Sequence, residues 1–204
     1  MTANWQPTAS METLRERARL LAAVRGFFAE RDVWEVETPV LGQGGSTDVH
    51  LVSLAALART EKGQRKLWLQ TSPEFHMKRL LAAGSGPIFQ LARSFRDGEV
   101  GARHNIEFTM LEWYRPGYTL AQLIEETTAL VMQVLPNSPG PVVHYRYREL
   151  FHTHLEVDPF TTSLETLRAL AAERANMPTS ALADDGRDTC LDLLMSLVIE
   201  PHLG

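Results

Sequence analysis

The chain has very little cysteine: among its 204 residues, Cys190 alone carries a thiol. One cysteine excludes an internal disulfide and a CxxC metal knuckle, and it fits a reducing compartment, so we expect a cytoplasmic protein. No apolar run is long enough to cross a bilayer, and residues 1–10 have neither the basic nor the apolar region of a secretory signal. We therefore expect no membrane partner.

The sequence also lacks internal repeats, an excess of basic charge and a phosphate-binding P-loop. Its formal net charge is -5, which gives no general attraction to nucleic acid. Residues 42–48 (GQGGSTD) form a glycine-rich turn, but no Gly-Lys-Ser/Thr follows them. With 44% hydrophobic residues, the chain can bury a sizeable core as one domain with a small subdomain.

The order of the segments predicts a mixed helix-and-strand protein. Residues 1–10 are polar and are expected to form a flexible arm, and apolar residues spaced by three and four predict a helix over 11–31. A break at PNSPGP (136–141) separates a core over residues 11–140 from a helical insertion or subdomain over 141–204. Cys190 lies on an amphipathic helix of that subdomain and is expected to be a buried thiol.

The segment TSPEFHMKRLLAAG (71–84) carries a strong helix-start signal. Ser72 can cap the helix with Pro73 at its first position, or Thr71 can cap it in a box with Glu74. Gly84 is a natural stop. Taken alone, Glu74 is a first-turn carboxylate favoured by the helix dipole.

The segment around which the chain is organised reads as strand, polar loop and strand, from Phe89 to Arg115. The return strand alternates with period two, which places Phe108, Glu112 and Tyr114 on one face. Arg96 ends the first strand, where a guanidinium can hold a carboxylate or phosphate with two parallel bonds. An aromatic ring, a carboxylate and an arginine together suit a ligand with a planar base, an amine and acidic groups, such as an aminoacyl-adenylate.

Three stretches resemble the class II aminoacyl-tRNA synthetases. FQLARSFRDGEVGARHNIEFTMLEWYRP is similar to motif 2 of that family, and RARLLAAVRGFFAERDVWEVETPVL is similar to motif 1, with Pro39 as its usual proline. HNIEFTMLEWYRP together with TSPEFHMKRLL resembles the lysyl branch, and within it most of all the elongation factor P lysine ligases. The resemblance covers most of the chain.

The resemblance implies an α+β class II catalytic fold, in which helices flank an antiparallel sheet. It implies ATP-dependent activation of lysine or β-lysine as an adenylate, with Mg²⁺, and transfer to a lysine side chain of elongation factor P. Motif 1 of the family builds a dimer interface, so a homodimer is expected. The helix similar to motif 1 begins near residue 11, which leaves no room for an N-terminal anticodon-binding domain, and the acidic balance makes tRNA the less favoured acceptor.

The roles of single residues follow from the same resemblance. Arg96 would be the catalytic residue, holding the substrate carboxylate and the α-phosphate. Phe108 would stack on adenine, and His104 and Asn105 would contact the phosphates or ribose. The remaining expected contacts are Asp97, Gly98 and Glu99 for ATP, and Ser72, Pro73, Glu74, Glu112 and Tyr114 for the amino acid. No metal ligand is assigned within the chain.

The sequence departs from the family pattern at two places. Motif 2 normally reads Arg, any residue, Glu, whereas here Gly98 takes the glutamate position and Glu99 follows one place late. Either Glu99 reaches the base through a loop shift, which a glycine makes cheap, or base recognition is weaker.

The second departure is the C-terminus. In the family, a glycine-rich third motif with its arginine, and the acidic strand that holds Mg²⁺, lie beyond the equivalent of Gly204, so the fold is expected to be incomplete there. The chain would then be a fragment or a natural short form, and we expect it not to form an adenylate efficiently by itself. Alternatives to the ligase are a lysyl-tRNA synthetase with tRNA as acceptor, or a truncated non-catalytic binding module.

Overall fold

The computed structural model describes residues 5–102, 104–135, 140 and 142–203. The chain divides between residues 138 and 139 into two compact units, each with a core of its own. The expected arm and the expected break at PNSPGP both lie partly outside the described residues, because 1–4, 136–139 and 141 are not among them. None of the helices in the described part of the chain is long and apolar enough to cross a membrane.

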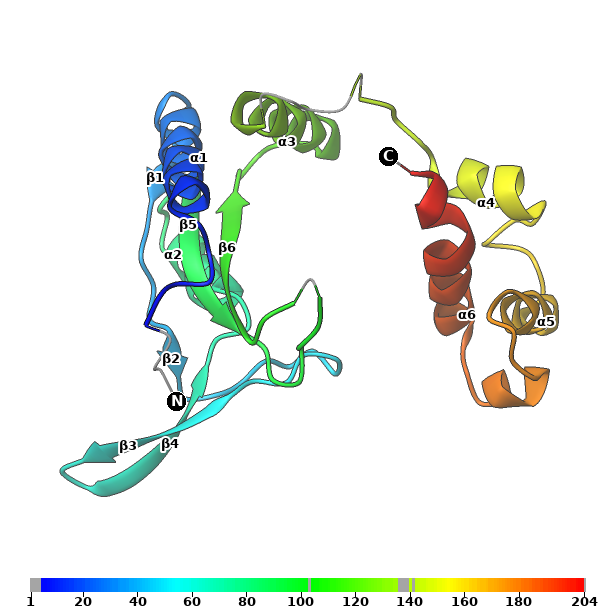
Figure 1. Cartoon of the computed structure of the whole chain (residues 1–204), viewed down its shortest axis with the longest axis horizontal. Coiled ribbons are helices and arrows are strands. Elements are labelled where there is room, and N and C mark those ends of the chain that lie inside the picture. Colours follow the sequence, from blue (N-terminus) through cyan, green and yellow to red (C-terminus); the bar gives the residue numbers. More distant parts are fainter. Residues whose placement is uncertain (1–4, 103, 136–139, 141, 204) are drawn as a thin grey trace. The chain divides into compact units, whose positions relative to one another are not determined.

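The first unit contains strands and three helices (Figure 1). Its elements in chain order are α1 (Met11–Ala29), β1 (Trp34–Glu35), β2 (Leu41–Gly42), β3 (Ala55–Thr60), β4 (Gly63–Leu69), α2 (Glu74–Ala82), β5 (Ile88–Phe95), β6 (Glu107–Tyr114) and α3 (Leu120–Val134). The predicted first helix and the two predicted strands of the central hairpin are confirmed to within two residues.

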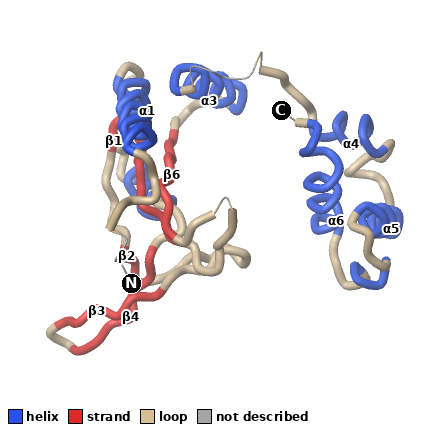
Figure 2. The backbone as a smooth tube through the Cα atoms, viewed as in Figure 1, coloured by secondary structure: helices blue, strands red, loops and turns tan. Residues whose placement is uncertain are grey.

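The larger sheet has the strand order β1-β5-β6 (Figure 2). β5 and β6 pair antiparallel along their whole length, from Ile88 opposite Tyr114 to Phe95 opposite Glu107. The antiparallel expectation is confirmed for this hairpin, whereas β1 runs parallel to β5. The parallel pair follows from the connection: the chain between β1 and β5 includes α2, which precedes β5 and returns the chain to the same end of the sheet.

One face of the β5–β6 hairpin packs against α1 and α3. Phe28 of α1 stacks on Phe89 of β5 with ring centroids 4.5 Å apart, and both rings are buried. Each such ring contributes about 1.5–3 kcal/mol by leaving water. The buried members of this core are Val24, Phe27, Phe28, Val33, Phe89 and Leu130.

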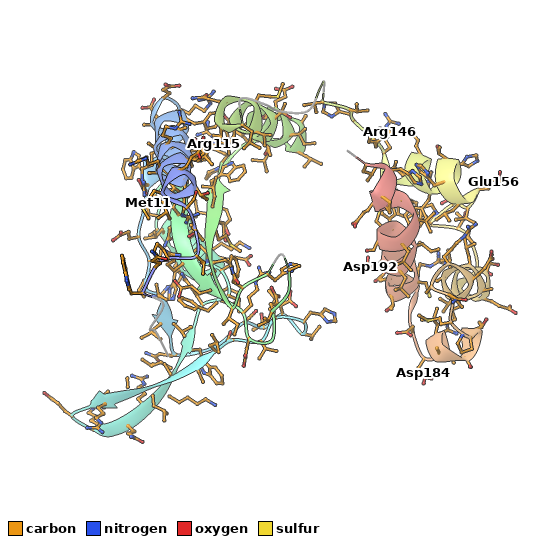
Figure 3. The ribbon with its side chains drawn as sticks, in the orientation of Figure 1. Met11, Arg115, Arg146, Glu156, Asp184 and Asp192 are labelled. Carbon is orange, nitrogen blue, oxygen red and sulfur yellow. The ribbon has the colours of Figure 1, made fainter. Side chains whose placement is uncertain are left out.

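A buried ion pair attaches the end of the hairpin, at Arg115 (labelled in Figure 3), to α3. Arg115 Nε lies 3.2 Å from Glu126 Oε1, and both side chains are less than a tenth exposed. The indole nitrogen of Trp113 donates to the other oxygen of Glu126 at 3.2 Å. Burial of a charged pair is tolerated only when further hydrogen bonds satisfy it, so these contacts fix where α3 begins relative to β6.

A capping box also defines the start of α3. Thr119 accepts from the backbone N–H of Gln122, and the Gln122 side chain accepts from the backbone of Thr119. Beyond this cap, however, Leu120 is 74% exposed, and Ile124 and Val131 are also exposed. Only part of the apolar stripe of this helix therefore meets the core.

The start of α2 differs from both expected arrangements. Pro73 itself occupies the cap position, the helix begins at Glu74, and no side chain caps it. Ser72 Oγ accepts from the Glu74 N–H at a long 3.3 Å. Pro73 is fully buried, so packing of the proline ring, rather than a cap hydrogen bond, sets where this helix begins. Gly84 has a φ of +88° and follows the helix end, as predicted.

A second small sheet has the order β2-β4-β3 and is antiparallel throughout. β3 and β4 form a ribbon that pairs from Ala55 opposite Trp68 to Thr60 opposite Gly63. β2 pairs only with Leu69 and Trp68 at the base of this ribbon.

The second unit is helical. It contains α4 (Tyr147–Leu155), α5 (Leu164–Arg174) and α6 (Arg187–Leu194), the 3₁₀ turns η1 (Thr179–Leu182) and η3 (Glu200–His202), and the π-turn η2 (Met195–Ile199). Its buried core comprises Leu150, Phe151, Leu155, Leu167, Ala171, Ala172, Leu182, Cys190, Leu191, Leu194 and Ile199. The expected burial of Cys190 is confirmed, and burial raises the pKa of its thiol.

Candidate functional site

Arg96, Glu99 and Phe108 come together at the loop end of the hairpin. A guanidinium nitrogen of Arg96 lies 3.8 Å from a carboxylate oxygen of Glu99, and the guanidinium carbon lies 5.1 Å from the centre of the Phe108 ring. Both charged side chains are only about a quarter to a third exposed. A cation held over an aromatic ring in a half-buried position is suited to bind an anion attached to a planar group.

Part of the Arg96 guanidinium has no partner of its own. The Nε atom is buried and makes no hydrogen bond to the described residues. A buried unsatisfied donor costs free energy, but an atom without accessible surface is out of a ligand's reach, so an anion would meet the quarter of the side chain that is exposed. The backbone around it is fixed, since the Arg96 N–H donates to the Ile106 carbonyl at 2.9 Å.

The glycine that replaces the expected glutamate sits at a sharp turn. Gly98 has a φ of +78°, in the left-handed region that other residues adopt only at a cost. This turn brings Glu99 back toward Arg96, as the ion pair shows. The loop geometry therefore favours the alternative in which Glu99 takes over the position left by Gly98.

Three other predicted ATP contacts lie on the exposed part of the loop. Asp97, His104 and Asn105 are all exposed, and their side chains make no hydrogen bond or ion pair within the described residues. The backbone of His104 forms a bridge with Gly101, and the Asp97 N–H donates to the Val52 carbonyl at 2.8 Å. The structure thus orders the backbone of this loop without placing these three side chains against the Arg96 group.

At the other end of β6, Glu112 and Tyr114 lie on the same face, as the period-two pattern predicts. The Tyr114 hydroxyl donates to Glu112 Oε1 at 2.6 Å. Burial raises the pKa of Glu112, the Tyr114 hydrogen bond opposes that rise, and the negative charge of Glu74 adds to it. Burial together with the Glu112 carboxylate raises the pKa of Tyr114, which keeps it a neutral donor.

The first turn of α2 lies against this pair. The Glu74 carboxylate forms an ion pair with Lys78 one turn along the helix. The charge of Lys78 also lowers the pKa of Glu112, so one ammonium acts on both carboxylates. Two carboxylates that a single ammonium stabilises form a site that is suited to an amine-bearing ligand.

A cavity of about 360 Å³ opens beside the start of α2. Ser72 and Glu74 line it from one side, whereas Pro73 between them is buried and does not. The other walls come from β4 and from the glycine-rich turn after β2. The additional lining residues are Gly42, Gly44, Gly45, Ser46, Thr47, Asp48, Leu51, Ser53, Trp68, Leu69, Gln70, Thr71, Phe75 and His76.

The glycine-rich turn is the part of this site that the sequence reasoning missed. A β-carbon on Gly45 would lie 3.1 Å from the Ser53 side chain, and one on Gly42 would lie 3.2 Å from the Gly44 carbonyl. These close approaches let the turn fold back over the cavity. Its signal in the sequence is the cluster GQGGSTD, which lacks the P-loop pattern.

The described residues contain no group of three or more histidine, cysteine, aspartate and glutamate side chains that could hold a metal ion. No residue described in this structure is therefore assigned to Mg²⁺.

A sequence model of the family described as "tRNA synthetases class II (D, K and N)" matches residues 3–170. That match covers most of the chain, and the chain belongs to this family. The expected α+β class II fold is thereby confirmed, and with it the resemblance of the two motif-like stretches to class II synthetases.

Within that family, the chain is similar to proteins with a more particular name. Curated relatives from Salmonella paratyphi B and Salmonella heidelberg are each 46% identical to it over 205 residues and are named elongation factor P–(R)-β-lysine ligase. The matches cover 100% of this chain and 62% of each relative. The chain thus spans a little under two thirds of the length of the curated relatives that it matches.

Proposed function

We propose that the protein activates β-lysine, or lysine, with ATP and transfers it to a lysine side chain of elongation factor P. The observation that carries this proposal is the arrangement on one face of β6. Phe108 beneath Arg96 stands at one end and Glu112 beside Tyr114 at the other. Phe108 and Glu112 are four positions apart along the strand, roughly 13 Å, which leaves room for an extended ligand with a base at one end and an amine at the other.

In this proposal the acidic residues select the amino acid. Glu112, held by Tyr114, binds the side-chain ammonium, and Glu74 with Ser72 binds the other amine from the cavity side. The substrate ammonium then takes over the role of Lys78 as counter-ion to these carboxylates. A neutral side chain would leave the partly buried Glu112 without a cationic partner, and this penalty excludes apolar amino acids.

Arg96 acts at the reacting end. The exposed part of its guanidinium and its face over Phe108 fit a carboxylate and a phosphate placed side by side. The substrate carboxylate oxygen would form a bond to the α-phosphorus while the bond from that phosphorus to the pyrophosphate oxygen breaks. No protein nucleophile is needed, because the residues contribute position and positive charge. ATP and Mg²⁺ are general to ligases of this class, and no residue of this chain is assigned to the metal.

The same proposal includes a cytoplasmic homodimer. α1 and β1 carry the stretch similar to motif 1, and Trp34 of β1 is 66% exposed. An exposed tryptophan beside the expected interface motif supports pairing of two copies there.

A transfer assay tests the proposal. A form of the protein that spans the whole length of the curated relatives is incubated with ATP, Mg²⁺ and elongation factor P, with (R)-β-lysine or lysine, and the mass of the acceptor is measured by mass spectrometry. We expect one added residue on elongation factor P and none on bulk tRNA. Charging of tRNA with an unmodified acceptor protein would favour the synthetase alternative, and modification of neither would favour the binding module.

A further inference from the structure

Away from the cavity-lining residues Trp68 and Leu69, the β3–β4 ribbon takes no part in the proposed reaction. In Figure 1 it projects away from α1 and α3. β2 covers only Leu69 and Trp68 at its base, so residues 57–66 form a two-stranded tip. An isolated two-stranded ribbon is marginally stable in water, and β3 presents an unpaired edge.

One face of this tip combines an apolar side chain with positive charge. Leu57 lies directly opposite Lys66, and Arg59 lies two residues further along the same face. Leu57 is 71% exposed, and the Lys66 ammonium lies 4.2 Å from the centre of the Trp68 ring. Isolated exposed leucines are ordinary, but one flanked by two cations on a projecting ribbon resembles the centre of an interaction patch.

The charge of the ribbon is opposite to that of the chain. Residues 55–69 contain the four cations Arg59, Lys62, Arg65 and Lys66 and the single anion Glu61, a net charge of +3, whereas the whole chain carries -5. Within the described residues none of these four cations forms an ion pair, although cations elsewhere in the unit do. Their charge is therefore available to a partner.

We propose that the tip of the β3–β4 ribbon docks an acidic surface of the protein that accepts the activated amino acid. The inference rests on the proposed function, which supplies a protein acceptor. Leu57 favours a protein surface over RNA, and the net charge of the chain opposes a polyanion as the main partner. Tip-to-tip pairing with a second copy of the chain is disfavoured, because two ribbons would bring like charges together.

The test compares two charge reversals in the full protein. Arg59→Glu changes the ribbon, and Arg174→Glu, at an exposed position of α5, makes the same change of charge elsewhere. With elongation factor P as acceptor, Arg59→Glu should raise KM for the acceptor about fivefold to tenfold, and Arg174→Glu should leave it unchanged. Neither substitution should alter ATP–pyrophosphate exchange, since neither residue lies in the site.

A second variant tests the apolar part of the patch. Leu57→Ser should raise KM for the acceptor about threefold with unchanged exchange. Added salt should raise KM for the wild type more steeply than for Arg59→Glu, because one attractive charge has already gone. Equal effects of Arg59→Glu and Arg174→Glu, or no effect of either, would overturn the proposal and leave the cations as a solvated strand edge.

Direct binding separates this inference from the proposed function. Biolayer interferometry with immobilised elongation factor P reports docking even if the wild type shows no pyrophosphate exchange. If the wild type shows no exchange but binds elongation factor P in a way that depends on Arg59, the proposed function is refuted and the docking role of the ribbon is supported. If exchange occurs but binding to elongation factor P does not depend on Arg59, the docking role of the ribbon is refuted and the proposed function stands. If Arg59→Glu weakens binding of tRNA instead, the tip is an RNA-binding surface.

Discussion

The two units of this chain use their interiors differently. The helical unit buries only apolar side chains in its core, from Leu150 to Ile199. The unit with the sheet buries Thr71, Gln90, Ser94 and Glu126 as well. All four buried side-chain atoms without a hydrogen-bond partner in the described residues (Gln70 Oε1, Ser94 Oγ, Arg96 Nε and Arg115 Nε) also lie in the sheet unit.

Their arginines show the same contrast. In the helical unit, Arg187 donates to the carbonyls of Pro159 and Thr162, and Arg168 donates twice to the carbonyl of Asp185. These guanidiniums are satisfied and hold loops together. Arg96 in the sheet unit keeps a buried donor unused. A satisfied arginine contributes to stability, whereas a buried donor without a partner, such as the Nε of Arg96, costs stability.

The largest effect should follow from opening the helical core. Phe151 is fully buried there, so Phe151→Ala should lower the free energy of unfolding of this unit by about 3–5 kcal/mol. Urea unfolding followed by circular dichroism measures the change. Phe160→Ala, at a position 60% exposed, is the matched control and should cost less than about 1 kcal/mol. Similar losses for both would contradict the assignment of the core.

In the sheet unit, substitution of Arg96 should have the opposite effect: a large loss of activity with little change in stability. Arg96→Ala should lower the rate of pyrophosphate exchange about 100-fold to 1,000-fold, because charge at the α-phosphate is no longer stabilised. The free energy of unfolding should change by no more than about 0.5 kcal/mol, because the substitution removes only an unsatisfied donor and one weak ion pair. Arg96→Lys keeps the charge and should recover part of the rate; a stability loss as large as that of Phe151→Ala would erase the contrast.

Glu112 provides a second test in the sheet unit, this time of substrate binding. Glu112→Gln should raise KM for (R)-β-lysine about 30-fold, because the substrate ammonium loses its buried counter-ion. Tyr114→Phe is the milder companion, since it removes only the hydrogen bond to Glu112 and should raise KM less. If Glu112→Gln left KM unchanged, the side-chain amine of the substrate would not bind at Glu112.

The pH dependence of stability provides an independent check on Glu112. Its pKa is raised above the ordinary 4.5 by burial, so the folded chain binds this proton more tightly than the unfolded chain does. The stabilisation from protonation is complete below the unfolded pKa and is lost as pH rises through the folded pKa. Urea unfolding should therefore show Glu112→Gln gaining stability relative to the wild type as the pH rises above the ordinary carboxyl pKa of 4.5. If the wild type instead gained stability relative to Glu112→Gln as the pH rises, the inferred direction of the Glu112 pKa shift would be wrong.

The smallest effect concerns the turn that replaces the family glutamate. Gly98→Ala should cost about 1–2 kcal/mol, because Gly98 has positive φ although a β-carbon there would meet nothing within 4 Å. KM for ATP should rise as Glu99 loses its approach to Arg96. Gly101→Ala has equal space without positive φ and should be neutral in thermal unfolding and in KM.

What the sequence could predict depended on how local the cause is. The shared face of Glu112 and Tyr114 follows from spacing alone and is confirmed. The start of α2 was not predictable, because burial of Pro73 overrides the cap signals beside it. The cavity beneath the glycine-rich turn depends on contacts such as Gly45 against Ser53, which only the tertiary fold creates.

The exposed apolar residues of α3 also could not be predicted from the sequence. Spacing identifies a stripe but not how much of it finds a partner, and Leu120 stays exposed while Leu130 is buried. The roles of His104 and Asn105 rest on the family resemblance, since their side chains make no contact that assigns them. They remain predictions.

ATP–pyrophosphate exchange by the full protein, with (R)-β-lysine, with lysine and with neither, tests the central claim that one face of β6 binds both ends of an adenylate. The claim predicts exchange that requires the amino acid, that falls at least about 100-fold in Arg96→Ala and that shifts in KM in Glu112→Gln. Exchange that persists without an amino acid, or that neither substitution alters, would contradict it.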